Sequence, residues 1–138
     1  NIKQGTHNNY ININKSFDDI YIKKLISFLY NNKIQINKEI NPFKMIKIAL
    51  FFKCDALIYK LLNNILKDLN DTKCIALMDL IQGDLNGVKE IEKSKNKCLE
   101  YIATHLQRIV KTDAYSKLIR TNPVLANDIL VYVANKNQ

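Results

Sequence analysis

Apolar residues recur every three or four positions along most of the chain, which is the spacing of amphipathic helices. The segment 10–14 differs, because apolar and polar residues alternate there as they do in a β-strand. A weaker alternation at 33–36 fits either a short strand or a turn. The chain contains only three Gly and two Pro, which favours long helices joined by short turns. The pattern therefore predicts a mostly α-helical fold of helical hairpins with one or two short strands.

Polar residues that prefer helix termini mark the ends of the expected helices. Asn followed by Pro, at 41–42 and 122–123, is an N-cap followed by a residue suited to the first turn. Ser16, with Asp19 three residues later, forms a capping box, and Asn70 and Thr112 are further caps. We expect seven helices, at about 16–31, 42–53, 58–69, 71–81, 98–109, 113–120 and 123–133.

The segment 83–97 is the most polar part of the chain, and we expect a loop or an exposed helical turn there. Within it, Glu90 and Glu92 lie among lysines between positions 89 and 97. A nucleic-acid-binding patch would keep one sign of charge, whereas mixed signs are typical of a solvent-exposed helix face. This run is therefore predicted to face solvent.

Length and charge narrow the possible functions. A chain of 138 residues forms one ordinary domain or two small helical pieces that share a core. Its net charge is +8, but Arg108 and Arg120 are its only arginines, and phosphate and base recognition rely on the guanidinium group. Nucleic-acid binding is therefore disfavoured. The sequence shows no apolar run long enough for a membrane span and no signal peptide, so we expect a cytoplasmic or nuclear protein without a membrane partner.

The reactive side chains do not form a catalytic pattern. Three cysteines, Cys54, Cys74 and Cys98, lack any Cys-x-x-Cys pair, so we expect reduced core thiols and neither disulfides nor a metal site. Cys98 and His105 would lie about 10.5 Å apart along one helix, too far for a nucleophile and its base. The paired aspartates at 18–19 and 68–71 fit helix ends. With no phosphate-binding loop and no zinc helix, we expect no catalytic residues and no cofactor.

Several segments, in order, resemble the C-terminal half of a BTB/POZ domain followed by a truncated BACK segment. Residues 11–14 are similar to the strand before the third helix of that family, and Phe28-Leu-Tyr30 to its Phe-Ile-Tyr-Thr-Gly. Residues 45–57 are similar to its Leu-Leu-x-Ala-Ala-x-x-Tyr-x-x-x-x-Leu, and residues 109–118 with 122–126 to the BACK part. The resemblance divides the chain into a BTB-like part, 1–69, and a BACK-like part, 70–138.

The resemblance implies a protein-interaction module that acts as a substrate adaptor for a cullin-3 ubiquitin ligase. In the family the BTB part binds the cullin, and the BACK helices extend that contact or self-associate. The implied partner-binding residues are Asn31, Asn32, Lys33, Phe52, Lys53, Cys54, Asp55, Tyr115, Leu118 and Ile119. This chain has Lys3-Gln4-Gly5 where the family carries an apolar-x-Glu cullin motif. Two alternatives stay open, a helical scaffold or oligomerisation domain unrelated to ubiquitin and a basic helical nucleic-acid-binding domain.

Overall fold

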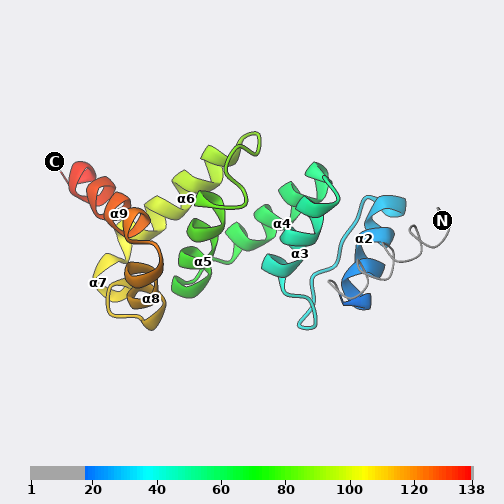
Figure 1. Cartoon of the computed structure of the whole chain (residues 1–138), viewed down its shortest axis with the longest axis horizontal. Helices are drawn as coiled ribbons and strands as arrows, with labels where there is room; N and C mark the ends of the chain where they lie inside the picture. Colours follow the sequence, from blue (N-terminus) through cyan, green and yellow to red (C-terminus); the bar gives the residue numbers. More distant parts are fainter. Residues whose placement is uncertain (1–17, 138) are drawn as a thin grey trace, which may run out of the picture. The chain divides into compact units, whose positions relative to one another are not determined.

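The computed structural model describes residues 18–137, and this part of the chain contains eight helices and no strand (Figure 1). The mostly α-helical prediction is confirmed. The strand expected at 10–14 lies outside the described residues, and the alternating segment 33–36 has no regular structure. The helices are α2 (Asp19–Asn31), α3 (Pro42–Phe51), α4 (Asp55–Lys67), α5 (Asp71–Gln82), α6 (Ile91–Thr104), α7 (Leu106–Ile109), α8 (Asp113–Thr121) and α9 (Pro123–Lys136).

The chain divides into two compact units, residues 1–61 and residues 62–138. The division falls inside α4, whereas the boundary expected from the sequence lies after residue 69, just beyond the end of this helix. The described part of the first unit therefore consists of α2, α3 and the first half of α4. The second unit contains the rest of α4 and the helices α5 to α9.

Four of the predicted N-caps are confirmed. In each, the side-chain oxygen accepts a hydrogen bond from a backbone N–H two or three residues later, which satisfies a donor that the first helical turn leaves unpaired. The four caps are Asn41, Asn70, Thr112 and Asn122.

The start of α2 differs from the prediction. Asp18, and not Ser16, occupies the N-cap position, and Ser16 lies outside the described residues. The Asp18 carboxylate makes no capping hydrogen bond. It forms an ion pair with Lys44 at 2.7 Å instead, which connects the start of α2 to α3.

In the first unit, α2 is attached to its neighbours near both ends. The Asn41 backbone N–H, just before α3, donates a hydrogen bond of 2.9 Å to the Tyr21 hydroxyl. At the other end, the Lys60 ammonium of α4 donates to the backbone carbonyl of Asn32. The same ammonium lies 5.4 Å from the centre of the Phe28 ring, within cation–π range. These contacts hold α2 against α3 and α4, and one face of α2 is buried there.

In the second unit, α5 packs against α6 and α8, and α9 packs against the same two helices. The four helices therefore form a closed ring around one core. Met78, Ile102 and Ile129, from three of these helices, are almost completely buried in it. Burial of such side chains is the main source of stability for a helical unit of this size.

The cysteines follow the prediction in part. Cys74 and Cys98 are fully buried, and the Cys74 thiol donates a hydrogen bond of 3.3 Å to the backbone carbonyl of Cys98 across α5 and α6. An interaction with the Cys98 side chain, together with burial, raises the pKa of the Cys74 thiol, which disfavours the reactive thiolate. Cys54 departs from the expectation of a core thiol, because it is only half-buried at the start of α4.

The helix expected at 98–109 is longer at its start and broken near its end. It begins at Ile91, because Ser94 and Ile91 continue the buried face one turn and two turns before Cys98. The polar Ser94 in a core position hid this continuation from the sequence pattern. The helix breaks at His105, whose Nδ1 lies 3.0 Å from the Tyr101 carbonyl, so α6 and the short α7 form in place of one helix.

The mixed-charge run at 89–97 faces solvent, as predicted, except at its two buried positions Ile91 and Ser94. It forms the end of a loop and the first half of α6. Its lysines and glutamates therefore cover the outer face of a helix.

Candidate functional site

The predicted partner-binding turn after α3 carries a pair of exposed aromatic rings. Phe51 and Phe52 are 56% and 40% exposed, and their ring centroids lie 5.0 Å apart in an edge-to-face arrangement. Large aromatic side chains are usually buried, and they are enriched among the residues that dominate binding energy at interfaces. The exposed pair therefore marks the end of α3 as a candidate binding site.

The backbone around this pair holds the turn in a defined shape. Lys53 adopts the left-handed conformation, with φ of 56°. Its N–H bonds to the Leu50 carbonyl (3.1 Å), and the Cys54 N–H bonds to the Ala49 carbonyl (2.8 Å). This is a Schellman motif, in which glycine is the usual left-handed residue. A lysine at this position costs about 1–2 kcal/mol relative to its preferred conformations. The next residue but one, Asp55, is exposed at the start of α4.

The predicted turn Asn31–Lys33 is also exposed and lies at the end of α2. Asn32 is left-handed, with φ of 55°, and ends the helix with a hydrogen bond of 2.7 Å to the Phe28 carbonyl. The Lys60 contact to Asn32 joins this turn to α4, the helix that begins immediately after the aromatic pair. The first two groups of predicted residues thus belong to one unit and are connected through α4.

The third predicted group, on α8 in the second unit, offers less surface than expected. Tyr115 and Leu118 are each only 3% exposed, because they form the buried face of α8. Ile119 is 50% exposed and is the member of this group that a partner can reach directly. Burial raises the pKa of Tyr115, and its hydroxyl has no hydrogen-bond partner among residues 18–137.

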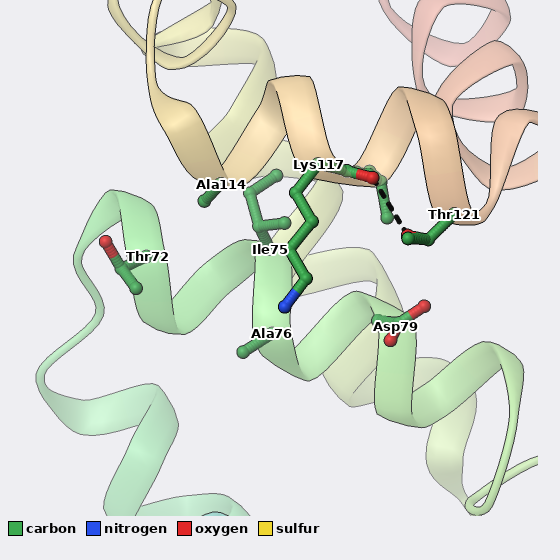
Figure 2. A pocket seen from close by; sticks show the side chains of 8 residues that line it. Thr72, Ile75, Ala76, Asp79, Ala114, Lys117 and Thr121 are labelled. Carbon is green, nitrogen blue, oxygen red and sulfur yellow. Dashed lines mark hydrogen bonds between the residues drawn. The ribbon is translucent and has the colours of Figure 1, made fainter.

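A pocket of about 240 Å³ lies between α5 and α8 (Figure 2). Its apolar part is formed by side chains that are buried or small: Ile75, Ala76, Ala114 and Leu118. The polar residues at its edge are Thr72, Asp79, Lys117 and Thr121. Figure 2 shows the Lys117 side chain extending from α8 over the pocket towards α5.

No sequence motif marks this α5–α8 pocket. The pocket exists because several side chains between the two helices are small. The exposed residues of α5 are Thr72, Ala76 and Asp79, which follow helical spacing and lie opposite Ala114 of α8. That spacing is visible in the sequence, but nothing in it indicates that α8 packs beside α5. Asp79 accepts a hydrogen bond of 3.2 Å from Asn122, so the carboxylate is already in use.

A polar cluster holds the start of α5 to α6 and α7. Arg108 donates two hydrogen bonds to the Asp71 carboxylate, at 2.7 and 2.8 Å, and the Tyr101 hydroxyl donates a third at 2.9 Å. Hydrogen bonding to the Arg108 guanidinium is the main reason that the pKa of Asp71 is lowered. His105 stacks on Tyr101 with ring centroids 4.3 Å apart. Asp71 therefore lies at a helix end, as predicted, but it binds a cation rather than capping the helix.

The described residues offer few groups suited to metal binding or to a membrane. Within residues 18–137 no three His, Cys, Asp or Glu side chains gather as metal ligands. None of the helices in this range has the length and apolar character needed to cross a membrane. The exposed aromatic turn in the first unit and the α5–α8 pocket in the second are two candidates for binding.

Comparison of the chain with models of protein families, with curated protein sequences and with solved structures gives no match. The site is therefore interpreted from its own residues.

Proposed function

We propose that this chain is a non-catalytic protein-interaction module. The observation that carries the proposal is the exposed pair Phe51 and Phe52 at the end of α3. Exposed aromatic rings cost free energy in water, and this cost is recovered when a partner covers them. A left-handed Lys53 directly follows the pair, and strained backbone conformations cluster at functional sites.

The narrower form of the proposal is a substrate adaptor of a cullin-3 ubiquitin ligase. It is supported by the BTB-like and BACK-like sequence segments and by the position of Phe52 in the turn where that family binds its cullin. An apolar side chain of the partner that packs beside Phe52 would contribute about 1.5–3 kcal/mol. A tenfold change in affinity corresponds to about 1.4 kcal/mol, so loss of this one contact is measurable.

The test is a calorimetric titration of the chain with the N-terminal domain of cullin-3. We expect Phe52→Ala to weaken binding by about tenfold or more while the helical dichroism spectrum is unchanged. Leu130→Ala is the matched control, because Leu130 is similarly exposed (46%) but lies on α9 in the second unit. We expect the control to bind as the unsubstituted chain does.

Two results would count against the adaptor. Absence of binding at about 100 μM of both proteins would exclude the cullin-3 mechanism, because such an affinity is too weak for a stable complex. Equal loss of affinity in Phe52→Ala and Leu130→Ala would show that the aromatic turn is not the binding site.

A further inference from the structure

Helix α2 has a buried face and an exposed apolar face. Its buried face is formed by Tyr21, Leu25 and Phe28. A second set of large apolar side chains points away from this core: Ile26, Leu29 and Tyr30, which are 48%, 65% and 86% exposed. Residues three and four positions apart are neighbours on a helix surface, so these three form one continuous apolar patch. A helix that needed only its own core would place polar residues there.

The charge around this patch is mostly positive, with Asp19, in the first turn of α2, and Glu39 just outside the two ends of the segment 20–38. The segment 20–38 contains four lysines, at 23, 24, 33 and 38, and no Asp or Glu. None of these four ammonium groups forms an ion pair with a carboxylate of residues 18–137. Lys44, by contrast, is paired with Asp18. The lysines beside the exposed face of α2 therefore have unused capacity to bind anionic groups.

Two of these lysines line a pocket of about 200 Å³ between α2 and the segment that follows it. Lys24 and Lys33 face it together with Ser27, Asn31, Ile34 and Gln35. The Asn31 amide donates to the Ser27 hydroxyl oxygen at 3.4 Å, which leaves the proton of that hydroxyl free to be donated. The described residues that line the pocket include no carboxylate, and their polar groups are two cations and several hydrogen-bond donors, a set that suits a carboxylate.

We propose that this surface binds an acidic amphipathic segment of a partner protein. The surface, here called the α2 surface, is the exposed side of α2: Ile26, Leu29 and Tyr30 form one flank of it, and the pocket of Lys24 and Lys33 forms the other. Ser27, which lines the pocket, lies three residues before Tyr30 and so connects the two flanks. Apolar side chains of the partner pack on the apolar flank, and a partner carboxylate enters the pocket between the two lysines. The inference rests on the proposed role as a protein-interaction module, but it does not require that the partner be cullin-3.

An acidic protein segment fits these observations better than a nucleic acid does. Both arginines of the chain, Arg108 and Arg120, belong to the second unit, so the α2 surface lacks the guanidinium groups that contact phosphates in pairs. A phosphate backbone also gives the aliphatic side chains of Ile26 and Leu29 nothing to bury against. Apolar contact combined with opposite charge is the pattern of helix-in-groove peptide recognition.

The probe is a fluorescein-labelled peptide of about 15 residues with Glu on one helical face and Leu on the other, at a length where helix formation is feasible. Its binding to the 138-residue chain is followed by fluorescence anisotropy. We expect the double substitution Lys24→Glu and Lys33→Glu to weaken binding by about tenfold or more, because two attractions become repulsions. The matched control is Lys93→Glu with Lys97→Glu, which changes the net charge equally on the exposed face of α6.

The apolar half of the α2 surface is tested separately. Leu29→Ser is expected to weaken peptide binding by about fivefold to tenfold, while Leu130→Ser on α9 leaves it unchanged within about twofold. A scrambled peptide, with the same composition but no apolar face, is expected to bind more weakly than the amphipathic one.

Three results would overturn the inference: no binding of the amphipathic peptide, equal losses in the lysine variant and its α6 control, or tighter binding of single-stranded DNA or anionic vesicles than of the peptide. The first two leave the Phe52→Ala result with cullin-3 unaffected, so the failure of this inference is distinguishable from the failure of the proposed function. The third would assign the lysines to a different class of partner.

Discussion

The α2 surface of the first unit and the α5–α8 pocket of the second differ in how their charged groups are used. On the α2 surface, Lys24 and Lys33 face a pocket that has no carboxylate among its described lining residues. In the α5–α8 pocket, Lys117 is accompanied by Asp79, which Asn122 already binds. A charged group that has no partner within its own unit is available to a partner molecule, whereas one that is already engaged must first give up a contact.

The two regions differ in the same way in their apolar side chains. Leu29 and Tyr30 of α2 are 65% and 86% exposed. The large apolar residues beside the α5–α8 pocket, Ile75 and Leu118, are 4% and 3% exposed because they already belong to the core of the second unit. The comparison supports the proposal that the α2 surface, rather than the α5–α8 pocket, binds the partner.

The largest expected effect is a loss of stability when the core of the second unit is disrupted. Ile102→Ala removes a fully buried side chain from the four-helix ring and should lower the free energy of unfolding by roughly 2–5 kcal/mol. Ile119→Ala, half exposed on α8, should change it by less than about 0.5 kcal/mol. Urea unfolding followed by circular dichroism measures both. A loss below about 0.5 kcal/mol for Ile102→Ala would mean that the ring does not stabilise the unit as described.

The next effect concerns the polar cluster that holds α5 to α7. Asp71→Asn removes the charge that Arg108 binds, so we expect lower stability at neutral pH, by less than Ile102→Ala. Because the pKa of Asp71 is lowered in the folded state, its contribution is fully present above the unfolded-state pKa and is lost as pH falls through the folded-state pKa. The difference in stability between the two proteins should therefore shrink in acid. A difference that does not change between neutral and acid pH would contradict this role.

A smaller effect is expected at the aromatic turn. Lys53→Gly relieves the left-handed strain in the Schellman motif and should raise the free energy of unfolding by about 1 kcal/mol. Lys93→Gly, on the exposed face of α6, is the control and should lower it by about 1 kcal/mol, because glycine weakens a helix interior. Destabilisation by Lys53→Gly would mean that a contact of the lysine side chain stabilises the fold by more than the backbone strain destabilises it.

The smallest effect is expected at the α5–α8 pocket. Ala76→Leu fills part of it from the exposed side of α5, and we expect the affinity for the acidic peptide to change by less than about twofold. A reduction of tenfold, with unchanged helical content, would show that the peptide binds this pocket and would reverse the comparison between the two units.

Much of the fold could be predicted because the local signals agree with the final packing. Asn41, Asn70, Thr112 and Asn122 combine strong capping preference with a following apolar pattern, and each caps a helix. Prediction failed where one residue contradicts its surroundings. Ser94 occupies a core position that an apolar residue would ordinarily fill, so the apolar pattern alone predicts a start of α6 that is too late.

The candidate site could be predicted only in part. Asn31–Lys33 and Phe52 were singled out from the sequence, and both turns are exposed. Helical spacing places Tyr115, Leu118 and Ile119 on the inward face of α8, and the first two are buried. The pattern could not tell that Ile119 is half exposed, because that depends on how α8 packs against α5 and α9. Within residues 18–137 Lys24 forms no ion pair, and this depends on which side chains fold next to it, which spacing along the chain does not reveal.

The central claim is that partner binding occurs on the first unit, and an amide chemical-shift map tests it most directly. The chain, labelled with ¹⁵N, is titrated with the amphipathic acidic peptide. We expect the shifted amides to lie in residues 22–35, around Lys24, Leu29 and Lys33, with those of α5 and α8 unchanged. Shifts centred on Ala76 and Lys117, or spread evenly over both units, would contradict the account.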